Sequence, residues 1–411
     1  MSRILDINLA PGGEKKIAWV SRNMPILHSI AAEFEKDKPF KGLNITLSVH
    51  LEAKTAYLCR VLALGGARMF VTGSNPLSTQ DDVAAALAAG GIEVFATHGC
   101  TMEQYEQDLR SALSCGPSII IDDGGDLVHL VHTELSELLP GIIGGCEETT
   151  TGIHRLKAMA RAGELKFPMV MVNEADCKHL FDNRYGTGQS VFDGINRTTN
   201  LIVAGKRVVV AGYGWCGKGV AMRAKGLGAK VIVTEIDPVR AIEAHMDGFE
   251  VMPMDDAAAI GDMFITVTGC CGVIRKEHFL QMKDGAILSN AGHFDVEVDV
   301  AALSALAVDR YEARNNIQGY RLPNGKTIFV LAEGRLVNIA AGDGHPAEIM
   351  DMSFAIQALS ARFLAEHGRE LAPGVVPVPA EIDRSVAFQK LATLGISIDA
   401  LSDEQKSYLG I

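Results

Sequence analysis

Val208-Val-Val-Ala-Gly212-Tyr-Gly214-Trp-Cys-Gly217-Lys-Gly219 is the stretch of sequence that indicates the fold most directly. A β-branched apolar run leads into a turn in which Gly212, Gly214 and Gly217 fill the pattern G-x-G-x-x-G. In a strand–turn–helix unit the first glycine permits the tight turn, the second lets a pyrophosphate approach the backbone, and the third allows the helix to pack closely on the strand. The amides at the start of the helix favour an anion. The stretch therefore predicts a Rossmann unit that binds a dinucleotide.

An acidic residue at the end of the next expected strand indicates which dinucleotide is bound. The run Val231–Thr234 is followed by Glu235, about 20 residues after the glycine turn, where a carboxylate hydrogen-bonds the ribose diol. A carboxylate there repels a 2′-phosphate, so NAD is favoured over NADP. A phosphate-binding P-loop is the alternative, but Gly219 stands where that motif needs the Ser or Thr that holds magnesium. We therefore expect NAD as the cofactor.

Strand-sized apolar runs alternate with helical stretches on both sides of this motif. Before it, the expected strands are Leu43–Val49, Arg68–Thr72, Glu93–Ala96 and Ser118–Asp122, with helices at Thr55–Leu64, Asp81–Ala89 and Met102–Leu113. From the motif onward, the expected strands are Arg207–Ala211, Lys230–Thr234, Met263–Val267, Gly285–Ser289 and Ile328–Val330. Such alternation implies parallel sheets covered by helices on both faces. We expect an α/β fold with two doubly wound parallel-sheet domains.

The polar stretch Asp182–Thr198, rich in Asn and Gly, is the natural boundary between these domains. We expect residues 1–183 to form the first part of a discontinuous substrate-binding domain, and residues 184–344 to form an inserted NAD-binding Rossmann domain. Residues 345–411 have helical patterns on both sides of the Pro-rich run Pro373–Pro379. Because this tail has no sheet of its own, we expect a helical return to the first domain or contact with a partner subunit.

Composition excludes several classes of protein. The net charge of −12 argues against nucleic-acid binding, which depends on clustered Lys and Arg, and no basic block indicates a membrane surface. The longest apolar runs are strand-sized, and Met1–Pro11 lacks the pattern of a signal peptide. None of the 8 cysteines is spaced C-x-x-C, and the adjacent pair Cys270-Cys271 is a poor start for a zinc site. We expect reduced thiols, no metal site and a cytoplasmic enzyme.

The rest of the chain carries short strings of polar and glycine residues, namely Ser78-Thr-Gln-Asp81, Asp122-Asp-Gly-Gly-Asp126-Leu, Glu147-Glu-Thr-Thr-Thr-Gly152, Phe181-Asp-Asn-Arg-Tyr-Gly186, Thr234-Glu-Ile-Asp-Pro238, Thr268-Gly-Cys270, Gly292-His-Phe-Asp-Val-Glu297, Leu331-Ala-Glu-Gly-Arg-Leu-Val-Asn338, Gly344-His-Pro346 and Tyr408-Leu-Gly410. In this order, and over nearly the whole chain, these strings resemble the S-adenosylhomocysteine hydrolase (adenosylhomocysteinase) family. So many matches in one order make chance similarity a poor explanation.

The resemblance implies a reaction: NAD-dependent, reversible hydrolysis of an S-nucleosyl-L-homocysteine to a nucleoside and L-homocysteine, a step of the methyl cycle. In that family, bound NAD takes hydride from the ribose 3′ carbon, the 3′-ketone acidifies the 4′ proton, and homocysteine leaves from the 5′ carbon. Water then adds and the hydride returns, so NAD is a recycled catalyst. The resemblance also implies a homotetramer, and closure of one domain on the other to exclude water from the ketone.

The same resemblance assigns the two proton transfers at the ribose. Lys178 and Asp182 would handle the 3′-hydroxyl, with Lys178 as the base for oxidation, and Asp123 would abstract the 4′ proton. A lysine acts as a base at neutral pH only if burial or a nearby positive charge lowers its pKa, and the nicotinamide cation would supply such a charge. Asp122 and Asp126, on either side of Asp123, are interpreted as caps of the turn.

Other matched residues would complete the catalytic site. His50 and His293 would flank the 5′ position as acid–base groups for the leaving thiol and the incoming water. Glu148 would bind the sugar hydroxyls or assist proton movement, and Asn183 would hold the cofactor domain's end of the sugar. Besides the glycine turn and Glu235, the cofactor contacts implied by the resemblance are Thr149, Thr150, Thr151, Thr268, Asn290 and Asn338. One of the three consecutive threonines can be only an N-cap, but we expect at least one to contact NAD.

The purine-reading string departs from the family pattern. His-x-Thr-x-Glu or His-x-Thr-x-Gln is usual, whereas this chain has His50-Leu-Glu52-Ala-Lys54, and Asp343 replaces a Met that commonly precedes the Gly-His of His345. Lys54 is donor-only and suits the 6-oxo group of hypoxanthine, while ionised Glu52 is acceptor-only and suits its N1–H. The site therefore resembles that of S-inosylhomocysteine hydrolases, and we expect the inosyl substrate to be modestly favoured. The alternatives are S-adenosylhomocysteine as the main substrate, with Asp343 accepting from the amino group, or a solvated surface pair.

Two other classes of function remain to be distinguished. An ordinary dehydrogenase would release NADH one for one with substrate. A non-catalytic relative that only binds partners would have lost Lys178, Asp123 or His293, and all three are present.

Overall fold

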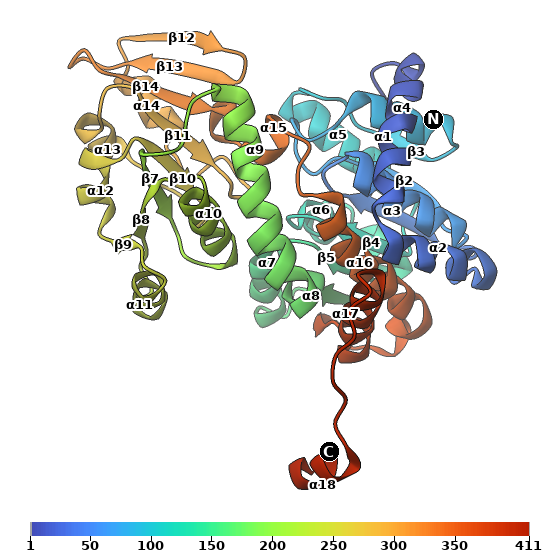
Figure 1. The fold of residues 1–411 in the computed structure, drawn as a ribbon. Coiled ribbons are helices and arrows are strands. Elements are labelled where there is room, and N and C mark those ends of the chain that lie inside the picture. The colour runs from blue at the N-terminus through green and yellow to red at the C-terminus, as the bar shows by residue number, and fades with distance from the viewer. Residues whose placement is uncertain (1, 411) are drawn as a thin grey trace.

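Two central sheets, one in each lobe, organise the chain (Figure 1), and the computed structural model describes residues 2–410. The first sheet has seven parallel strands in the spatial order β15-β6-β5-β4-β1-β2-β3. Their bounds are β1 (Asn44–Ser48), β2 (Arg68–Thr72), β3 (Glu93–Phe95), β4 (Ile119–Asp122), β5 (Gly144–Glu147), β6 (Pro168–Met171) and β15 (Gly374–Pro377). The parallel sheet predicted for the N-terminal half is confirmed.

The helices of the first lobe begin where the sequence supplies helix-starting residues. Pro11 and Pro25 stand in the first turns of α1 and α2, and Thr101 and Gln104 form a capping box at α5. These helices are α1 (Ala10–Arg22), α2 (Pro25–Asp37), α3 (Ala53–Leu64), α4 (Asp81–Ala89), α5 (Met102–Leu113), α6 (Asp126–Thr133) and α7 (Thr150–Arg161), with single 3-10 turns at Ile7–Leu9, Ser136–Gly141 and Val172–Glu174.

The second sheet has eight strands in the order β12-β13-β14-β11-β10-β7-β8-β9. The strands are β7 (Arg207–Ala211), β8 (Lys230–Thr234), β9 (Glu250–Val251), β10 (Met263–Thr266), β11 (Ala286–Asn290), β12 (Asp309–Arg314), β13 (Ile317–Arg321) and β14 (Thr327–Leu331). The helices of this lobe are α10 (Trp215–Gly226), α11 (Pro238–Met246), α12 (Met254–Ile260), α13 (Lys276–Gln281), α14 (Val300–Leu306) and α15 (Val337–Ala340), with a 3-10 turn at Ala332–Gly334.

The second sheet is parallel, as predicted, except at one edge, where the sequence analysis did not foresee an antiparallel hairpin. Strand β13 runs antiparallel to both β12 and β14. The connection between β12 and β13 is only Asn315-Asn316, and Asn316 adopts a positive φ of 61°. A two-residue connection of this kind joins antiparallel neighbours, whereas parallel strands need a long crossover. The Asn-Asn pair was the sequence signal for this hairpin.

Each of the two sheets has a point at which the order of its strands reverses direction. In the first sheet, β1 lies between β2 and β4, so the chain winds outward first on one side and then on the other. In the second sheet, β7 lies between β8 and β10 in the same way. Ligands of open α/β sheets bind outside the carboxyl ends of the strands at such points. The loops after β1, β4, β7 and β10 are therefore the places to look for a site.

A helical segment, not a loop, occupies the stretch predicted as the domain boundary. Helix α8 (Asp176–Lys178), a π-helical stretch at His179–Gly186 and α9 (Thr187–Thr199) follow one another without interruption. Figure 1 shows α9 lying between the two lobes. π-Helical turns occur frequently at functional sites, and this one contains Asp182.

The segment after His345 packs against the first lobe. Helix α16 (Ala347–His367) packs on α2, where the buried Asp351 carboxylate accepts hydrogen bonds from the amides of Ile26 (3.1 Å) and Leu27 (2.9 Å). After a 3-10 turn at Gly368–Glu370, the Pro-rich run adds β15 to the sheet edge beside β6. Proline is tolerated in edge strands. Helix α17 (Ala380–Thr393) then packs on α16, and α18 (Asp403–Leu409) projects away from both lobes (Figure 1).

Within residues 2–410, no helix is both long and apolar enough to cross a membrane. The eight cysteines are all free thiols.

Candidate active site

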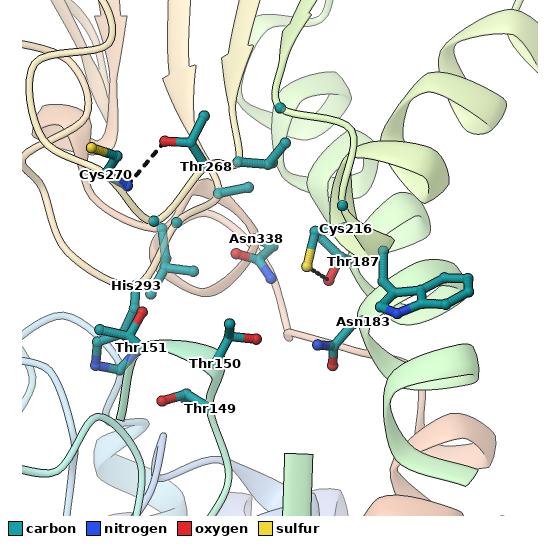
Figure 2. Close-up of a pocket in the computed structure, with 18 of the residues that line it drawn as sticks. Thr149, Thr150, Thr151, Asn183, Thr187, Cys216, Thr268, Cys270, His293 and Asn338 are labelled. Carbon is teal, nitrogen blue, oxygen red and sulfur yellow. Dashed lines mark hydrogen bonds between the residues drawn. The ribbon is translucent and has the colours of Figure 1, made fainter. Parts of the chain in front are cut away.

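A cavity of about 1200 Å³ lies between the carboxyl ends of the two sheets. Its lining combines residues after β1, β4 and β5 of the first lobe with residues after β7, β8 and β10 of the second. Figure 2 shows Thr149, Thr150 and Thr151 on one side of this space, with Thr268 and Cys216 on the other. The strand order therefore brings the two predicted half-sites to one cavity.

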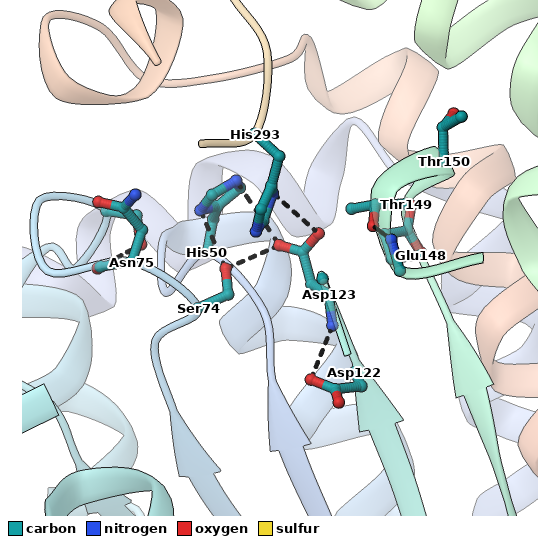
Figure 3. Close-up of polar contacts among 12 residues, drawn as sticks. His50, Ser74, Asn75, Asp122, Asp123, Glu148, Thr149, Thr150 and His293 are labelled. Atoms are coloured by element: carbon teal, nitrogen blue, oxygen red, sulfur yellow. Dashed lines mark hydrogen bonds and ion pairs between the residues drawn. The ribbon is translucent and has the colours of Figure 1, made fainter. Parts of the chain in front are cut away.

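Asp123 is the centre of a cluster of acid–base groups (Figure 3). One carboxylate oxygen lies 3.6 Å from Nε2 of His50 and the other lies 3.9 Å from Nδ1 of His293. The hydroxyl of Ser74 donates to Asp123 at 2.7 Å and lies 3.1 Å from Nδ1 of His50. His50 follows β1, Ser74 follows β2 and Asp123 follows β4, while His293 comes from the second lobe in the loop after β11. The cluster is thus assembled from both lobes.

The protonation of this cluster follows from burial and mutual charge. Burial by itself would raise the pKa of Asp123, but His50, His293 and the Ser74 hydrogen bond outweigh it, so the pKa lies below the usual range. Burial lowers the pKa of His50 to about 4, against the opposing charge of Asp123. At neutral pH the cluster therefore holds an ionised carboxylate beside a neutral His50, which is able to accept a proton.

Asp122 has the structural role predicted for it. Its carboxylate accepts hydrogen bonds from the amides of Asp123 and Val128, both at 3.0 Å, and so caps the turn that leads into α6. Asp126 pairs with Arg155 at 2.7 Å and accepts from the Tyr105 hydroxyl at 3.0 Å.

Lys178 is the centre of a second, fully buried cluster. Its ammonium donates to the side-chain oxygens of Asn173 (2.9 Å) and Asn183 (2.8 Å), and it lies 3.2 Å from Asp182 and 3.4 Å from Glu148. These residues come from the segments after β5 and β6 and from the π-helical stretch. The structure therefore brings together Lys178, Asp182, Asn183 and Glu148, and their catalytic roles stay predictions.

The charge state of Lys178 differs from the expectation for a free base. Burial by itself would lower the pKa of Lys178, but Asp182 and Glu148 outweigh it and the pKa is raised. The pKa of Asp182 is held well below its usual range, because Lys178 and His345 outweigh the effect of burial. Burial raises the pKa of Glu148 to about 7, although Lys178 opposes this. The protein's own groups thus keep the proton on Lys178, and a carboxyl able to take up a proton at neutral pH lies beside it.

His345 contacts the Lys178 cluster rather than standing alone. Its Nδ1 is hydrogen-bonded to Asp182, and its Nε2 lies 3.4 Å from the hydroxyl of Thr187. Ser353 of α16 donates to the other Asp182 oxygen at 2.9 Å. The substrate-contact prediction for His345 stays a prediction, and the geometry adds that His345 orients Asp182.

The glycine turn has the geometry that a dinucleotide needs. Gly212 has a positive φ of 102°, and Gly214 caps α10 with only Arg240 near the place a Cβ would occupy. A Cβ on Gly217 would lie 1.9 Å from the carbonyl oxygen of Gly212, so only glycine allows this helix–strand contact. Glu235 accepts from the amide of Tyr213 at 2.7 Å and lines the cavity.

We expect Gly217→Ala to weaken cofactor binding while leaving the first lobe intact. The added methyl group would collide with backbone, and overpacking of this kind costs roughly 1–3 kcal/mol or more, which corresponds to a loss of about tenfold or more in NAD affinity. The measurement is NAD content of the purified protein and NAD titration by fluorescence. Gly226→Ala is the matched control, because Gly226 ends the same helix and nothing lies within 4 Å of its Cβ position. Equal NAD affinity in both variants would contradict the assignment.

The remaining predicted cofactor residues fit an NAD molecule to different degrees. Thr149, Thr150 and Thr151 all line the cavity, but Thr149 is also the N-cap of α7, where its hydroxyl accepts from the Gly152 amide at 2.8 Å. Asn338 lines the cavity with a buried side-chain oxygen that has no hydrogen-bond partner among the described residues. An unused buried acceptor indicates a missing ligand. The open glycine cradle and Asn338 therefore fit NAD.

Thr268 and Asn290 have their side chains committed inside the protein. The hydroxyl of Thr268 donates to Glu297 at 2.7 Å, although the residue still lines the cavity. The Asn290 side chain donates to the carbonyls of Gly292 (3.0 Å) and Phe294 (2.8 Å) and does not line the cavity. The geometry thus disfavours the predicted cofactor contact of Asn290, which holds the loop that carries His293.

The residues predicted to read the purine are buried and are not a solvated pair. Glu52 is the N-cap of α3, and its carboxylate lies 2.5 Å from the ammonium of Lys54. Lys54 also donates to the backbone carbonyl of Asp343 at 2.9 Å, and both Glu52 and Lys54 line the cavity. The Asp343 carboxylate instead accepts from Gln80 at 3.2 Å, is exposed, and lies on a separate, smaller cavity. The Asp343 side chain therefore lies outside the large cavity, and the predicted reading of a purine by Glu52 and Lys54 stays a prediction.

Sequence reasoning missed several residues of the site. Ser74, Asn173 and Gln357 bind Asp123, Lys178 and Glu148 respectively. Ser74 and Asn173 follow strands of the first sheet, and this position was the available signal. Gln357 lies in the middle of α16 and gave no signal, because only the return of that helix to the first lobe brings it to Glu148.

Two lobes with a glycine-turn site on one, and buried acid–base groups facing it from the other, define a dinucleotide-dependent enzyme that works in an interdomain cavity. Family models described as S-adenosyl-L-homocysteine hydrolase and as its NAD binding domain match residues 2–140 and 183–344. An S-inosyl-L-homocysteine hydrolase of Methanococcus maripaludis is 59% identical over 100% of this chain and 98% of its own length. An adenosylhomocysteinase of Thermococcus kodakarensis is 59% identical over 99% of this chain and 96% of its own length. An S-inosyl-L-homocysteine hydrolase of Methanocaldococcus jannaschii is 58% identical over 100% of this chain and 98% of its own length.

The chain belongs to the S-adenosyl-L-homocysteine hydrolase family. It is an NAD-dependent hydrolase, and the NAD-binding region is the one that carries the glycine turn.

Proposed function

We propose that this enzyme hydrolyses an S-nucleosyl-L-homocysteine to a nucleoside and L-homocysteine through a 3′-keto intermediate, with the inosyl substrate favoured. The observation that carries the proposal is the arrangement of two separate buried proton-handling clusters, around Lys178 and around Asp123, in the cavity that also contains the glycine turn. A simple dehydrogenase needs one such group. A reaction that moves protons at the 3′, 4′ and 5′ positions of one ribose needs several.

Bound NAD supplies reversible hydride acceptance at the ribose 3′ carbon. Lys178 and Asp182 would orient the 3′-hydroxyl, and Lys178 would act as the base for its proton once the positive nicotinamide ring of NAD lies nearby and lowers the lysine pKa that Asp182 and Glu148 by themselves hold up. Asn173 and Asn183 fix the lysine through hydrogen bonds from its ammonium. The substrate would therefore meet a lysine of fixed position with an adjoining proton acceptor.

The Asp123 cluster would handle the other two positions. Asp123 is held ionised and can remove the acidified 4′ proton. His50 is neutral and can accept a proton from water attacking the 5′ position, while His293, on the opposite side of Asp123, can protonate the leaving thiolate. Because His293 comes from the second lobe, the cluster is complete only when the lobes lie as they do here.

Catalytic amounts of NAD should support many turnovers, because the net reaction is hydrolysis. The test is a homocysteine-release assay with NAD far below substrate, in which absorbance at the nicotinamide band stays constant at steady state. Growth of that band one for one with substrate consumption would show that the enzyme is a dehydrogenase.

Substrate choice follows from the donors and acceptors at the purine position. The Lys54 ammonium has three donors, of which Glu52 and the Asp343 carbonyl use two, so one remains for a 6-oxo group. Adenine would present its amino group to this donor and leave buried polar groups unpaired, at about 1–3 kcal/mol each. We expect a preference for S-inosyl- over S-adenosylhomocysteine of about tenfold or more in kcat/KM, since each ~1.4 kcal/mol is one decade.

The measurement is a side-by-side assay of both substrates with the wild type and with the double variant Glu52→Thr, Lys54→Glu, which should shift the preference toward adenine. Relatives of equal identity carry both names, so S-adenosylhomocysteine as the main substrate is the alternative. Equal rates on both substrates, unchanged in the double variant, would contradict the purine assignment. Assembly as a homotetramer stays a prediction.

A further inference from the structure

We propose that His50, Asp123 and His293 form a binding site for a divalent d-block cation, best matched by Zn²⁺, that bridges the two lobes. Each residue offers one ligand atom, and these atoms all lie within 4.8 Å of one another. The sequence gives no sign of the site, because its residues follow three different strands in two sheets. The expectation of no metal site rested on the cysteine spacing alone.

The donor set and spacing suit zinc. Imidazole nitrogens and a carboxylate oxygen are usual Zn²⁺ ligands, at about 2.0–2.2 Å from the metal, so neighbouring donors of a tetrahedral site lie about 3.3 Å apart. The observed separations from Asp123 are 3.6 Å to Nε2 of His50 and 3.9 Å to Nδ1 of His293. The third separation, between the two imidazole nitrogens, is at most 4.8 Å, so the two rings would have to approach each other by up to about 1.5 Å to close the site. A fourth position would remain for water on the cavity side.

Ser74 supplies the outer contact that orients such ligands. Its hydroxyl lies 3.1 Å from Nδ1 of His50 and 2.7 Å from the Asp123 carboxylate. This contact occupies the ring nitrogen of His50 away from Asp123 and leaves Nε2 directed at the cluster. Hydrogen bonds of this kind to metal-binding side chains typically change metal affinity by about 10- to 100-fold when they are removed.

His293 is a buried imidazole that the protein does not satisfy. Its side chain is only 7% exposed, and its Nε2 has no hydrogen-bond partner among the described residues. This nitrogen faces the backbone of Gly124, where a Cβ would lie 2.5 Å from it, while Nδ1 faces Asp123. The ring therefore presents Nδ1, 3.9 Å from the Asp123 carboxylate, as its metal ligand, while Nε2 is turned toward Gly124 and away from the site.

A metal held here would join the lobes and occupy the acid–base cluster. His50 and Asp123 belong to the first lobe and His293 to the second, so binding would need all three in the present arrangement. The cation would also displace the proton transfers assigned to these groups, and inhibition by the metal follows. The inhibition rests on the proposed function, but the binding does not.

The test measures binding directly on the NAD-loaded full-length protein, by competition for Zn²⁺ with a chromophoric chelator. We expect one tight site per chain, with affinity reduced more than tenfold in each of His50→Ala, Asp123→Ala and His293→Ala, and by about tenfold or more in Ser74→Ala. His129→Ala, which removes an exposed histidine of α6, is the matched control and should bind as the wild type does. Circular dichroism establishes that each variant is folded.

Three results would show that this metal site does not exist. They are absence of a tight site in the wild type, unchanged affinity in the His50 and His293 variants, or loss of binding only in a Cys270→Ser, Cys271→Ser variant, which would place the metal on the exposed thiols. Loss in a His50 variant together with full binding in the His293 variant would likewise exclude a bridge between lobes. A parallel assay of hydrolysis with and without Zn²⁺ separates this question from the reaction: binding without hydrolysis in the metal-free enzyme would leave the site standing and refute the proposed function.

Discussion

Lys178→Ala should lower kcat by about 10²–10⁴-fold, the usual contribution of a positioned acid–base group, and should prevent oxidation of the substrate. The lysine is the one ammonium that Asp182, Glu148, Asn173 and Asn183 all surround, so no other side chain of that cluster can take its place. Rapid mixing of enzyme and substrate should show no NADH-like absorbance band.

The control for this variant is Lys157→Ala. Lys157 is partly exposed and pairs with Glu174 at the surface, where an ion pair contributes about 0–1 kcal/mol to the free energy of unfolding. The activity of this variant should therefore be nearly unchanged. Because Lys178→Ala leaves buried carboxyl groups without their partner, folding is compared by circular dichroism. An NADH-like band that forms at the wild-type rate in folded Lys178→Ala would remove Lys178 from the oxidation step.

Asp123→Asn should give the opposite spectroscopic result. The amide keeps the shape of the side chain but cannot accept the 4′ proton, so oxidation should proceed while elimination stalls. We expect the NADH-like band to accumulate in a single turnover and kcat to fall by about 10²–10⁴-fold. Since Ser74 and His50 contact the same carboxylate, the variant should remain folded.

Asp122→Asn is the matched control for this second variant. Asp122 is the adjacent residue, is fully buried, and caps a turn without lining the cavity. Its change should affect stability more than the order of the chemical steps. A band in the Lys178 variant and none in the Asp123 variant would reverse the two assignments.

The sequence by itself determined the class of fold and the position of the cofactor turn. The run from Val208 to Gly219 does this locally, because Gly212 adopts a positive φ and a Cβ on Gly217 would lie only 1.9 Å from the carbonyl oxygen of Gly212. The alternation of buried strands and helices is also a local property of the sequence. The strands predicted before and after the glycine turn are present in the structure. The antiparallel hairpin at Asn315-Asn316 was missed, although its turn was readable.

Only the tertiary structure decided how the catalytic groups act on one another. His50, Ser74 and Asp123 are distant in sequence and meet because β1, β2 and β4 are neighbours in one sheet. The raised pKa of Lys178 could not be predicted from its identity, since it depends on two carboxyl groups brought within 3.4 Å by the fold.

The tertiary structure also decided which polar residues face the cavity and which only hold other parts of the protein in place. Asn290 and Asp343 were both predicted site residues, yet the side chain of Asn290 holds a loop and that of Asp343 faces a smaller cavity. From the sequence, Glu52 and Lys54 could equally be a solvated surface pair. Their burial in the structure excludes that interpretation. A local pattern specifies which hydrogen bonds a side chain can make, whereas packing determines which partner lies within about 3 Å of it.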